Sequence, residues 1–135
     1  MGQKTHPVGF RLSVNKNWRS KWFAGENFPS ELKEDVQIRK YLNHRLPNAG
    51  ISRVEISRTS KVVTVTIFTA RPGIVIGKGG EEVTRLKAEV AQLTEKEVQI
   101  NISEIKRPEL DAALVGANIA HQLIKKISYR RVVSK

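Results

Sequence analysis

The segment from Gly73 to Gly80, which reads GIVIGKGG, has the composition of a loop that binds phosphate groups. Glycines allow the main chain to approach a phosphate without a side-chain clash, and lysine supplies a positive charge. The segment does not fit the nucleotide-binding pattern G-x-x-x-x-G-K-[ST], because Gly73 and Gly77 enclose only three residues and Gly79 stands where the magnesium-binding hydroxyl belongs. A dinucleotide fingerprint also fails, since Glu82 occupies the position of its third glycine.

The pattern that remains is an apolar pair, Val75 and Ile76, which we expect to be buried, followed by G-x-x-G. This is the signature of the KH domain, in which two helices meet at a glycine loop that binds an RNA backbone. The pattern alone is weak, because it arises by chance and often only caps a helix. Here a predicted β-hairpin precedes it and an amphipathic helix follows it, which favours RNA binding. The predicted contacts are Gly77, Lys78, Gly79 and Gly80.

No residues are arranged for catalysis or for metal binding. The sequence has no cysteine, and its three histidines, His6, His44 and His121, lack metal-ligand spacing. Glu81 and Glu82 fall in the first turn of a predicted helix, where carboxylates ordinarily complement the helix dipole. Neither a nucleophile nor a substrate pocket accompanies them. We therefore predict a protein that is not an enzyme and that uses no cofactor and no metal.

The chain has 135 residues and carries 24 Lys and Arg against 13 Asp and Glu, a formal charge of +11. A folded surface tolerates this charge poorly without a polyanion, which indicates a nucleic acid or an anionic membrane as partner. The membrane is the weaker candidate, because no apolar run approaches the roughly 18 residues of a spanning helix. Residues 1–25 and the segment after Asp111 contain cations and no acid. The RNA contacts predicted from these two segments are Lys4, Arg11, Lys16, Arg19, Lys21, Arg130, Arg131 and Lys135.

Residues 1–29 are predicted to form an irregular basic arm, because proline and glycine interrupt the segment repeatedly. Four aromatic residues are spread among its cations. Their rings either stack on bases or pack the arm against the apolar surface of the domain, and the second interpretation is favoured for most of them. The four residues are Phe10, Trp18, Trp22 and Phe23.

Helical and strand patterns follow the arm. Ser30 is a good N-cap for a helix of about four turns, with Glu31, Glu34 and Asp35 placing negative charge in its first turn. Alternation of apolar residues within residues 54–68 predicts two strands that form an antiparallel hairpin.

After the glycine loop, apolar residues at spacings of three and four predict a helix over residues 80–94. Residues 98–102 alternate again and predict a third strand. A last helix opens at Pro108, and Val115, Ile119, Leu123 and Ile127 share one of its faces. Lysines near its C-terminal end are expected to cap carbonyls.

The order helix, strand, strand, helix, helix, strand predicts an α+β fold, a type II KH domain with a three-stranded sheet backed by helices. We expect a basic N-terminal arm at residues 1–29, the KH domain at residues 30–106, and a C-terminal helix within residues 107–135.

Three blocks of sequence together resemble one family, the bacterial type of small-subunit ribosomal protein S-three. These blocks are MGQKTHPVGFRL, TARPGIVIGKGGEEV, and KRPELDAALVGANIAHQL followed by YRR. The resemblance implies a cytoplasmic, ribosome-bound protein that binds small-subunit rRNA in the head, beside the channel through which messenger RNA enters. It also implies contacts with messenger RNA and with ribosomal proteins S-ten and S-fourteen.

The chain departs from this family in three respects. The family continues into a second α/β domain, of which residues 107–135 would supply only the start. Arg130 and Arg131 match two basic positions that the family places at the messenger RNA channel, whereas Ser134 occupies a third, with Lys135 beside it. In the glycine loop the family often has two lysines, and here Gly79 leaves Lys78 alone.

The sequence leaves three candidate functions from different classes. The first is a structural ribosomal protein, the second is a free RNA chaperone or regulator with a KH domain, and the third is a KH domain detached from an enzyme such as a ribosome-assembly GTPase. The third requires a guanine-nucleotide domain, which the sequence lacks. The long basic arm favours the ribosomal protein, because such arms become ordered when rRNA neutralises them.

Overall fold

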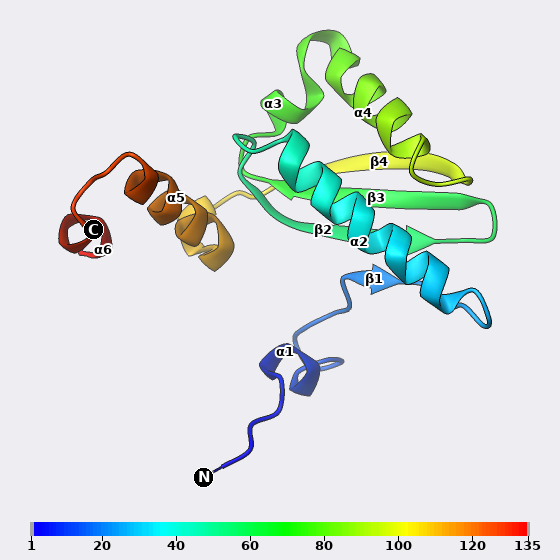
Figure 1. Cartoon of the computed structure of the whole chain (residues 1–135), viewed down its shortest axis with the longest axis horizontal. Helices are drawn as coiled ribbons and strands as arrows, with labels where there is room; N and C mark the ends of the chain where they lie inside the picture. Colours follow the sequence, from blue (N-terminus) through cyan, green and yellow to red (C-terminus); the bar gives the residue numbers. More distant parts are fainter. Residues whose placement is uncertain (1, 135) are drawn as a thin grey trace.

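A mixed four-stranded sheet with two helices on one face forms the body of the molecule, in a computed structural model that describes residues 2–134 (Figure 1). The helices are α2 (Phe28–Arg45) and α4 (Glu81–Ala91). The strands lie in the order β1-β2-β3-β4. They are β1 (Ser20–Lys21), β2 (Ile51–Arg58), β3 (Val62–Thr69) and β4 (Glu97–Glu104).

The three long strands are the predicted ones. β2 and β3 form the expected antiparallel hairpin, in which Val54 lies opposite Ile67 and Ile56 lies opposite Val65. β4 pairs with β3 in parallel, which places Val98 opposite Val63. Parallel pairing requires a crossover, and the helices α3 (Pro72–Ile76), η1 (Lys78–Gly80) and α4 supply it. The predicted order of helices and strands is confirmed.

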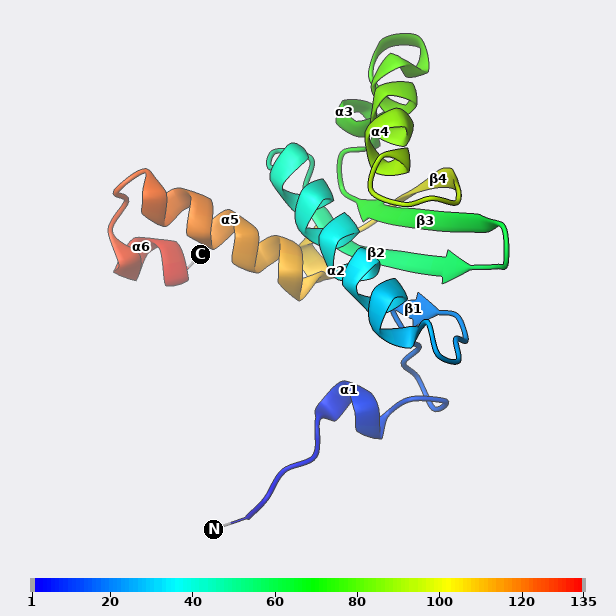
Figure 2. The same ribbon diagram turned by 45° about the vertical axis from the view of Figure 1, so that its right-hand side comes forward.

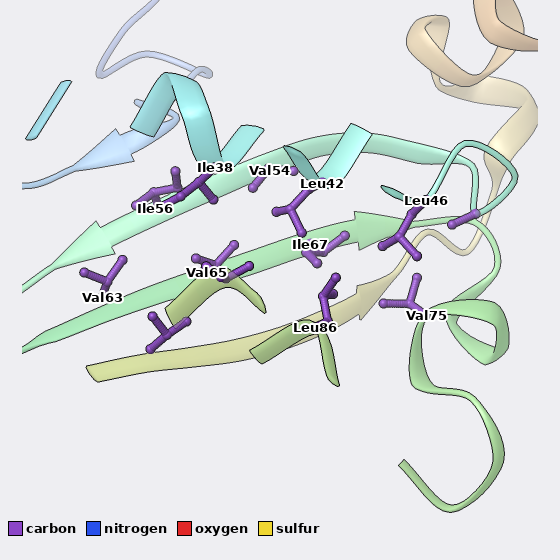
Figure 3. Close-up of a cluster of buried hydrophobic side chains, with 13 residues drawn as sticks. Ile38, Leu42, Leu46, Val54, Ile56, Val63, Val65, Ile67, Val75 and Leu86 are labelled. Atoms are coloured by element: carbon purple, nitrogen blue, oxygen red, sulfur yellow. The ribbon is translucent and has the colours of Figure 1, made fainter. Parts of the chain in front are cut away.

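Alternation along the strands determines the core (Figure 3). Every second residue of β2 and β3 points toward the two helices, and Ile56, Val65 and Ile67 are fully buried there. Ile38 and Leu42 of α2 pack on this face and are also fully buried. The apolar spacing of the two helices thus places their stripes on one sheet face, as expected of amphipathic helices.

The sequence prediction placed the start of α2 too late. The helix begins at Phe28, with Pro29 in its first turn, so Ser30 is a helical residue and its hydroxyl donates to the carbonyl of Asn27 at 2.8 Å. Proline is favoured at the first helical positions, because its missing N–H is not needed there. Of the three acids assigned to the first turn, only Glu31 lies in it.

The arm is more ordered than the sequence indicated. It contains a short helix, α1 (Pro7–Phe10), and the strand β1, which adds to β2 in parallel and extends the predicted three-stranded sheet to four strands. The prediction that most arm aromatics pack against the domain was wrong. Phe10, Trp18 and Phe23 are 73%, 63% and 97% exposed, and only Trp22 is partly buried.

The C-terminal segment forms two helices where one was expected. After the turn η2 (Pro108–Leu110) comes α5 (Ala112–Ile124), which has Lys125 as its C-cap, and α6 (Tyr129–Val133) follows. Lys126 adopts a left-handed conformation with φ of 60° and donates its amide to the carbonyl of Leu123. This is a helix stop of the kind usually built on glycine. Val115 and Leu123 of the predicted apolar face remain 41% and 45% exposed.

Candidate nucleic-acid interface

The glycine loop joins α3 to α4 at one end of the molecule (Figure 1). Gly77, Gly79 and Gly80 all have positive φ, at 71°, 63° and 82°. Glycine adopts such angles without strain, so the main chain can turn sharply before the start of α4. Val75 is fully buried, as predicted. Ile76 is 40% exposed, so the prediction that it is buried was wrong.

Gly77 is required for a second reason, the close approach of Glu82. A Cβ atom at Gly77 would lie 2.6 Å from Cγ of Glu82, well inside van der Waals contact. Gly79 and Gly80 have open space where a Cβ would point. The first glycine is therefore fixed by packing against α4, whereas the other two are fixed by backbone conformation alone.

Lys78 is exposed at the tip of the loop, and no ion pair to it occurs within residues 2–134. The N-terminal amides of α4 follow at once, and the helix dipole places partial positive charge there. Glu82 lies in the same turn, but its carboxylate is directed to Arg45 and Arg85, each at 3.5 Å. Its charge is thus offset by neighbouring cations.

Polar contacts between α2 and α4 hold the loop in place. Arg45 reaches both Glu82 and Glu89 of α4, the second at 3.4 Å. The hydroxyl of Tyr41 also donates to Glu89. This hydrogen bond lowers the pKa of Glu89 below its ordinary value and raises that of Tyr41, with Arg45 adding to the effect on Glu89. The helix that follows the loop is therefore tied to the first helix of the domain.

The predicted arm cations are all exposed, but they lie away from the loop. Both views place the arm at the opposite end of the body from α3 and α4 (Figures 1 and 2). Lys21 is directed toward Glu55 at 3.7 Å, and Arg11 donates to the carbonyl of Pro7. The exposed cations of the arm are Lys4, Arg11, Lys16, Arg19 and Lys21.

The carboxylate of Asp35 anchors this arm. The sequence had assigned it only to the negative charge in the first turn of a helix. Asp35 is fully buried and accepts hydrogen bonds from Ser20 at 2.9 Å and from the indole N–H of Trp22 at 2.7 Å. Arg58 of β2 donates to the same carboxylate at 2.6 Å and to Glu34 at 2.8 Å. Burial lowers the pKa of Arg58, but these two carboxylates outweigh it and raise the pKa above its ordinary value.

The third group of predicted contacts lies on α6. Arg130 and Arg131 are both exposed, and the guanidinium of Arg130 lies 5.9 Å from the ring of Tyr129. Val132 is buried and holds this short helix in place. Lys135 lies outside the described residues. The structure therefore divides the predicted site residues among three surfaces, which are the loop, the arm and α6. These three surfaces lie apart from one another (Figure 2).

Two other kinds of site are absent from the part of the chain that the structure describes. None of its helices combines the length and the apolar character that crossing a membrane requires. Residues 2–134 also bring together no group of three or more His, Asp or Glu side chains placed to hold a metal ion.

Comparison with known proteins agrees with the geometry of the loop. The sequence profile described as "KH domain" matches residues 37–110, which overlap the predicted domain and contain the whole loop. The match begins within α2 and ends in η2, so it includes β2, β3, β4 and both loop helices. The KH fold predicted from the sequence is thus confirmed for this segment.

Curated relatives match the chain over nearly all its residues. It is 58% identical to a protein of Cytophaga hutchinsonii over 135 residues, 100% of this chain and 53% of the relative. It is 56% identical to one of Parabacteroides distasonis and 58% identical to one of Flavobacterium johnsoniae, each over 98% of this chain. All three are named "Small ribosomal subunit protein uS3", which confirms the resemblance to the S-three family.

The chain spans about half the length of the curated relatives it matches. The KH profile, in contrast, covers more than half of the chain itself, and it does so over the elements that build the glycine loop. The motif, the order of elements and the profile all agree, and the chain belongs to the KH domain family.

Proposed function

We propose that this chain is an RNA-binding structural component of the small ribosomal subunit and that it acts by binding, without turnover. The observation that supports this most is its similarity, over 98% to 100% of its length, to proteins named "Small ribosomal subunit protein uS3". The KH fold and the formal charge of +11 point to the same class of partner.

In this proposal the loop holds a phosphodiester of rRNA. Lys78 is exposed and lies three residues before the start of α4, so its ammonium would supply charge while the N-terminal amides of α4 supply hydrogen bonds to the phosphate. The arm and α6 add contacts on two further surfaces, because their cations are exposed. These contacts position the protein on RNA without reading its sequence.

A finer placement follows from the resemblance to S-three and is proposed with it. The chain would lie in the head of the small subunit, with S-ten and S-fourteen as neighbours and with Arg130 and Arg131 facing messenger RNA at the channel where it enters. The exposure of both arginines on α6 is compatible with that role.

Sedimentation of a native lysate through a sucrose gradient tests the ribosomal assignment. We expect the chain to sediment with small subunits in stoichiometric amount and to remain there in salt that removes loosely bound proteins. If it stayed at the top of the gradient, the ribosomal assignment would fail and a free RNA-binding KH protein would be the better description.

The role of the loop is tested by the dependence of rRNA affinity on salt. Replacing Lys78 by Ala should weaken binding and lower the log-log salt slope by about 0.9, the value for one lost phosphate contact. Lys61→Ala is the matched control, because Lys61 is an exposed lysine in the turn between β2 and β3. Equal effects of the two changes would show that the loop has no special role.

A further inference from the structure

An apolar groove lies between β1 and the first turns of α2. Figure 1 shows that these two segments lie away from the glycine loop. Its volume is about 460 Å³, within the range of sites that bind small molecules or parts of larger ones. Trp18 and Phe28 are 63% and 50% exposed, so the groove presents aromatic faces to solvent. The lining residues are Trp18, Ser20, Lys21, Trp22, Phe28 and Leu32.

The floor of the groove is already held in position. The indole N–H of Trp22 donates to Asp35 at 2.7 Å, and this carboxylate is fully buried and paired with Arg58. The rings of Trp22 and Phe28 lie 5.4 Å apart at 49°. A ligand that enters the groove therefore meets oriented rings, and little further ordering is needed for binding.

Successive side chains along the extended backbone around β1 alternate in direction. Ser20 and Trp22 both donate to Asp35 of α2, so they point to the helix side, and alternation places Trp18 on that side as well. Arg19 and Lys21 alternate with them along the chain and are both exposed, and Lys21 also lines the groove. A groove with aromatic rings and cations beside them is the arrangement with which proteins bind single-stranded nucleic acid.

Charge favours RNA over an apolar protein segment as the occupant. Residues 1–25 contain five Lys and Arg and no acid. The acids on the neighbouring turns of α2 are paired, Glu31 with Lys96 at 2.9 Å and Glu34 with Arg58 at 2.8 Å. A polyanion approaching the groove thus meets exposed cations on the arm, while Glu31 and Glu34 on the helix are paired with cations.

We propose that this groove binds an unpaired RNA base, which stacks on Trp18 while the backbone lies along the cations of the arm. The inference rests on the proposed RNA-binding function and adds a second site to it, distinct from the loop. The loop contacts a phosphate, whereas the groove takes the flat face of a base.

Intrinsic fluorescence reports on this site directly, because the chain has two tryptophans and both line the groove. We would titrate the 135-residue chain with a single-stranded RNA of 12 nucleotides and, separately, with inorganic polyphosphate, which is a polyanion without bases. Stacking should quench the tryptophan emission with RNA, whereas polyphosphate should bind without quenching.

Replacing Trp18 by Ala should weaken the affinity for single-stranded RNA by roughly fivefold or more, the usual effect of removing one stacked base. The salt slope should stay the same, since no charge is removed. Because Trp18 is mostly exposed, the variant should remain folded. Phe23→Ala is the matched control, an aromatic residue of the same arm that is 97% exposed and outside the groove, and its affinity should not change.

The two proposals fail in different ways. If Trp18→Ala and Phe23→Ala both bind RNA like the unchanged chain and RNA does not quench emission, the stacking site is refuted while salt-dependent RNA binding still supports the loop. The groove would then suit an apolar protein segment. If the chain binds RNA at no salt concentration, both proposals are overturned.

Discussion

Gly77 combines φ of 71° with ψ of −171°, a backbone conformation that is essentially limited to glycine. Replacing it by Ala should reduce the free energy of unfolding by about 1–3 kcal/mol, because strain in the backbone adds to the overlap with Glu82. Urea denaturation measures the loss. Gly79→Ala has open space at its Cβ and should cost less, so equal losses for the two variants would contradict the packing argument.

Asp35 is the residue whose loss should most affect the anchoring of the arm. Asp35→Asn removes a fully buried charge opposite Arg58. Breaking a buried ion pair should lower the free energy of unfolding by about 3 kcal/mol, the lower end of the usual range, because Glu34 still contacts Arg58. Chemical denaturation measures the free energy of unfolding. The control is Glu34→Gln, a partner of the same arginine that is 29% exposed and should cost about 1 kcal/mol or less.

Residue types and spacing were enough to find the glycine loop, but not the network around Asp35. The pattern of Gly77, Lys78 and Gly80 is local, so its conformation can be predicted from a short segment. Asp35 acquires its partners from β1 and β2, which are distant in sequence. Its sequence context resembles an ordinary acid near a helix start, and only the fold shows that it is buried.

At the scale of elements, α5 is attached to the sheet through its N-cap, Asp111. The hydroxyl of Ser52 on β2 donates to this carboxylate at 2.6 Å and lowers its pKa below the ordinary value. Burial opposes the shift, while hydrogen bonds from the amides of Leu114 and Ala113 add to it. A carboxylate with a lowered pKa stabilises the folded state above its unfolded pKa, and this contribution disappears as the pH falls through the folded pKa.

We therefore expect α5 to open more readily in acid. Hydrogen exchange of its amides, measured from about pH 5 down to about pH 2, should show falling protection of α5 relative to β3 as Asp111 is protonated. In Asp111→Asn, which keeps a capping oxygen but does not titrate, this pH dependence should be absent. Identical profiles for the two chains would contradict the assignment of Asp111.

Elements with strong periodicity were predicted well, and short or irregular ones were not. The alternation of β2, β3 and β4 and the apolar stripes of α2 and α4 extend over many residues, so each pattern is clear. β1 has two residues, too few to show alternation, and only pairing with β2 makes it a strand. The break after α5 was missed because Lys126, not glycine, occupies the left-handed position that ends the helix.

At the scale of the whole molecule, the cations are divided among three surfaces. Contacts on separate surfaces should contribute independently to rRNA binding. We expect Lys78→Ala, Lys16→Ala and Arg130→Ala each to lower the salt slope by about 0.9 if each loses one phosphate, and the triple variant to show the sum. Filter binding to rRNA at several salt concentrations measures this. If the triple variant lowered the salt slope no more than the single variant with the largest effect, only one surface would contact RNA.

Neighbouring strands of the sheet are connected in two different ways, and the kind of connection affects the order in which the strands can pair. β2 and β3 are neighbours across a short turn, whereas β1 reaches β2, and β3 reaches β4, only through helical crossovers. Bringing distant segments together costs more chain entropy, so the hairpin should form first during folding. On a translating ribosome, the basic arm emerges before the strand that holds it. β4 emerges after the other three strands, so the glycine loop takes its final shape only once residues 97–104 have been made.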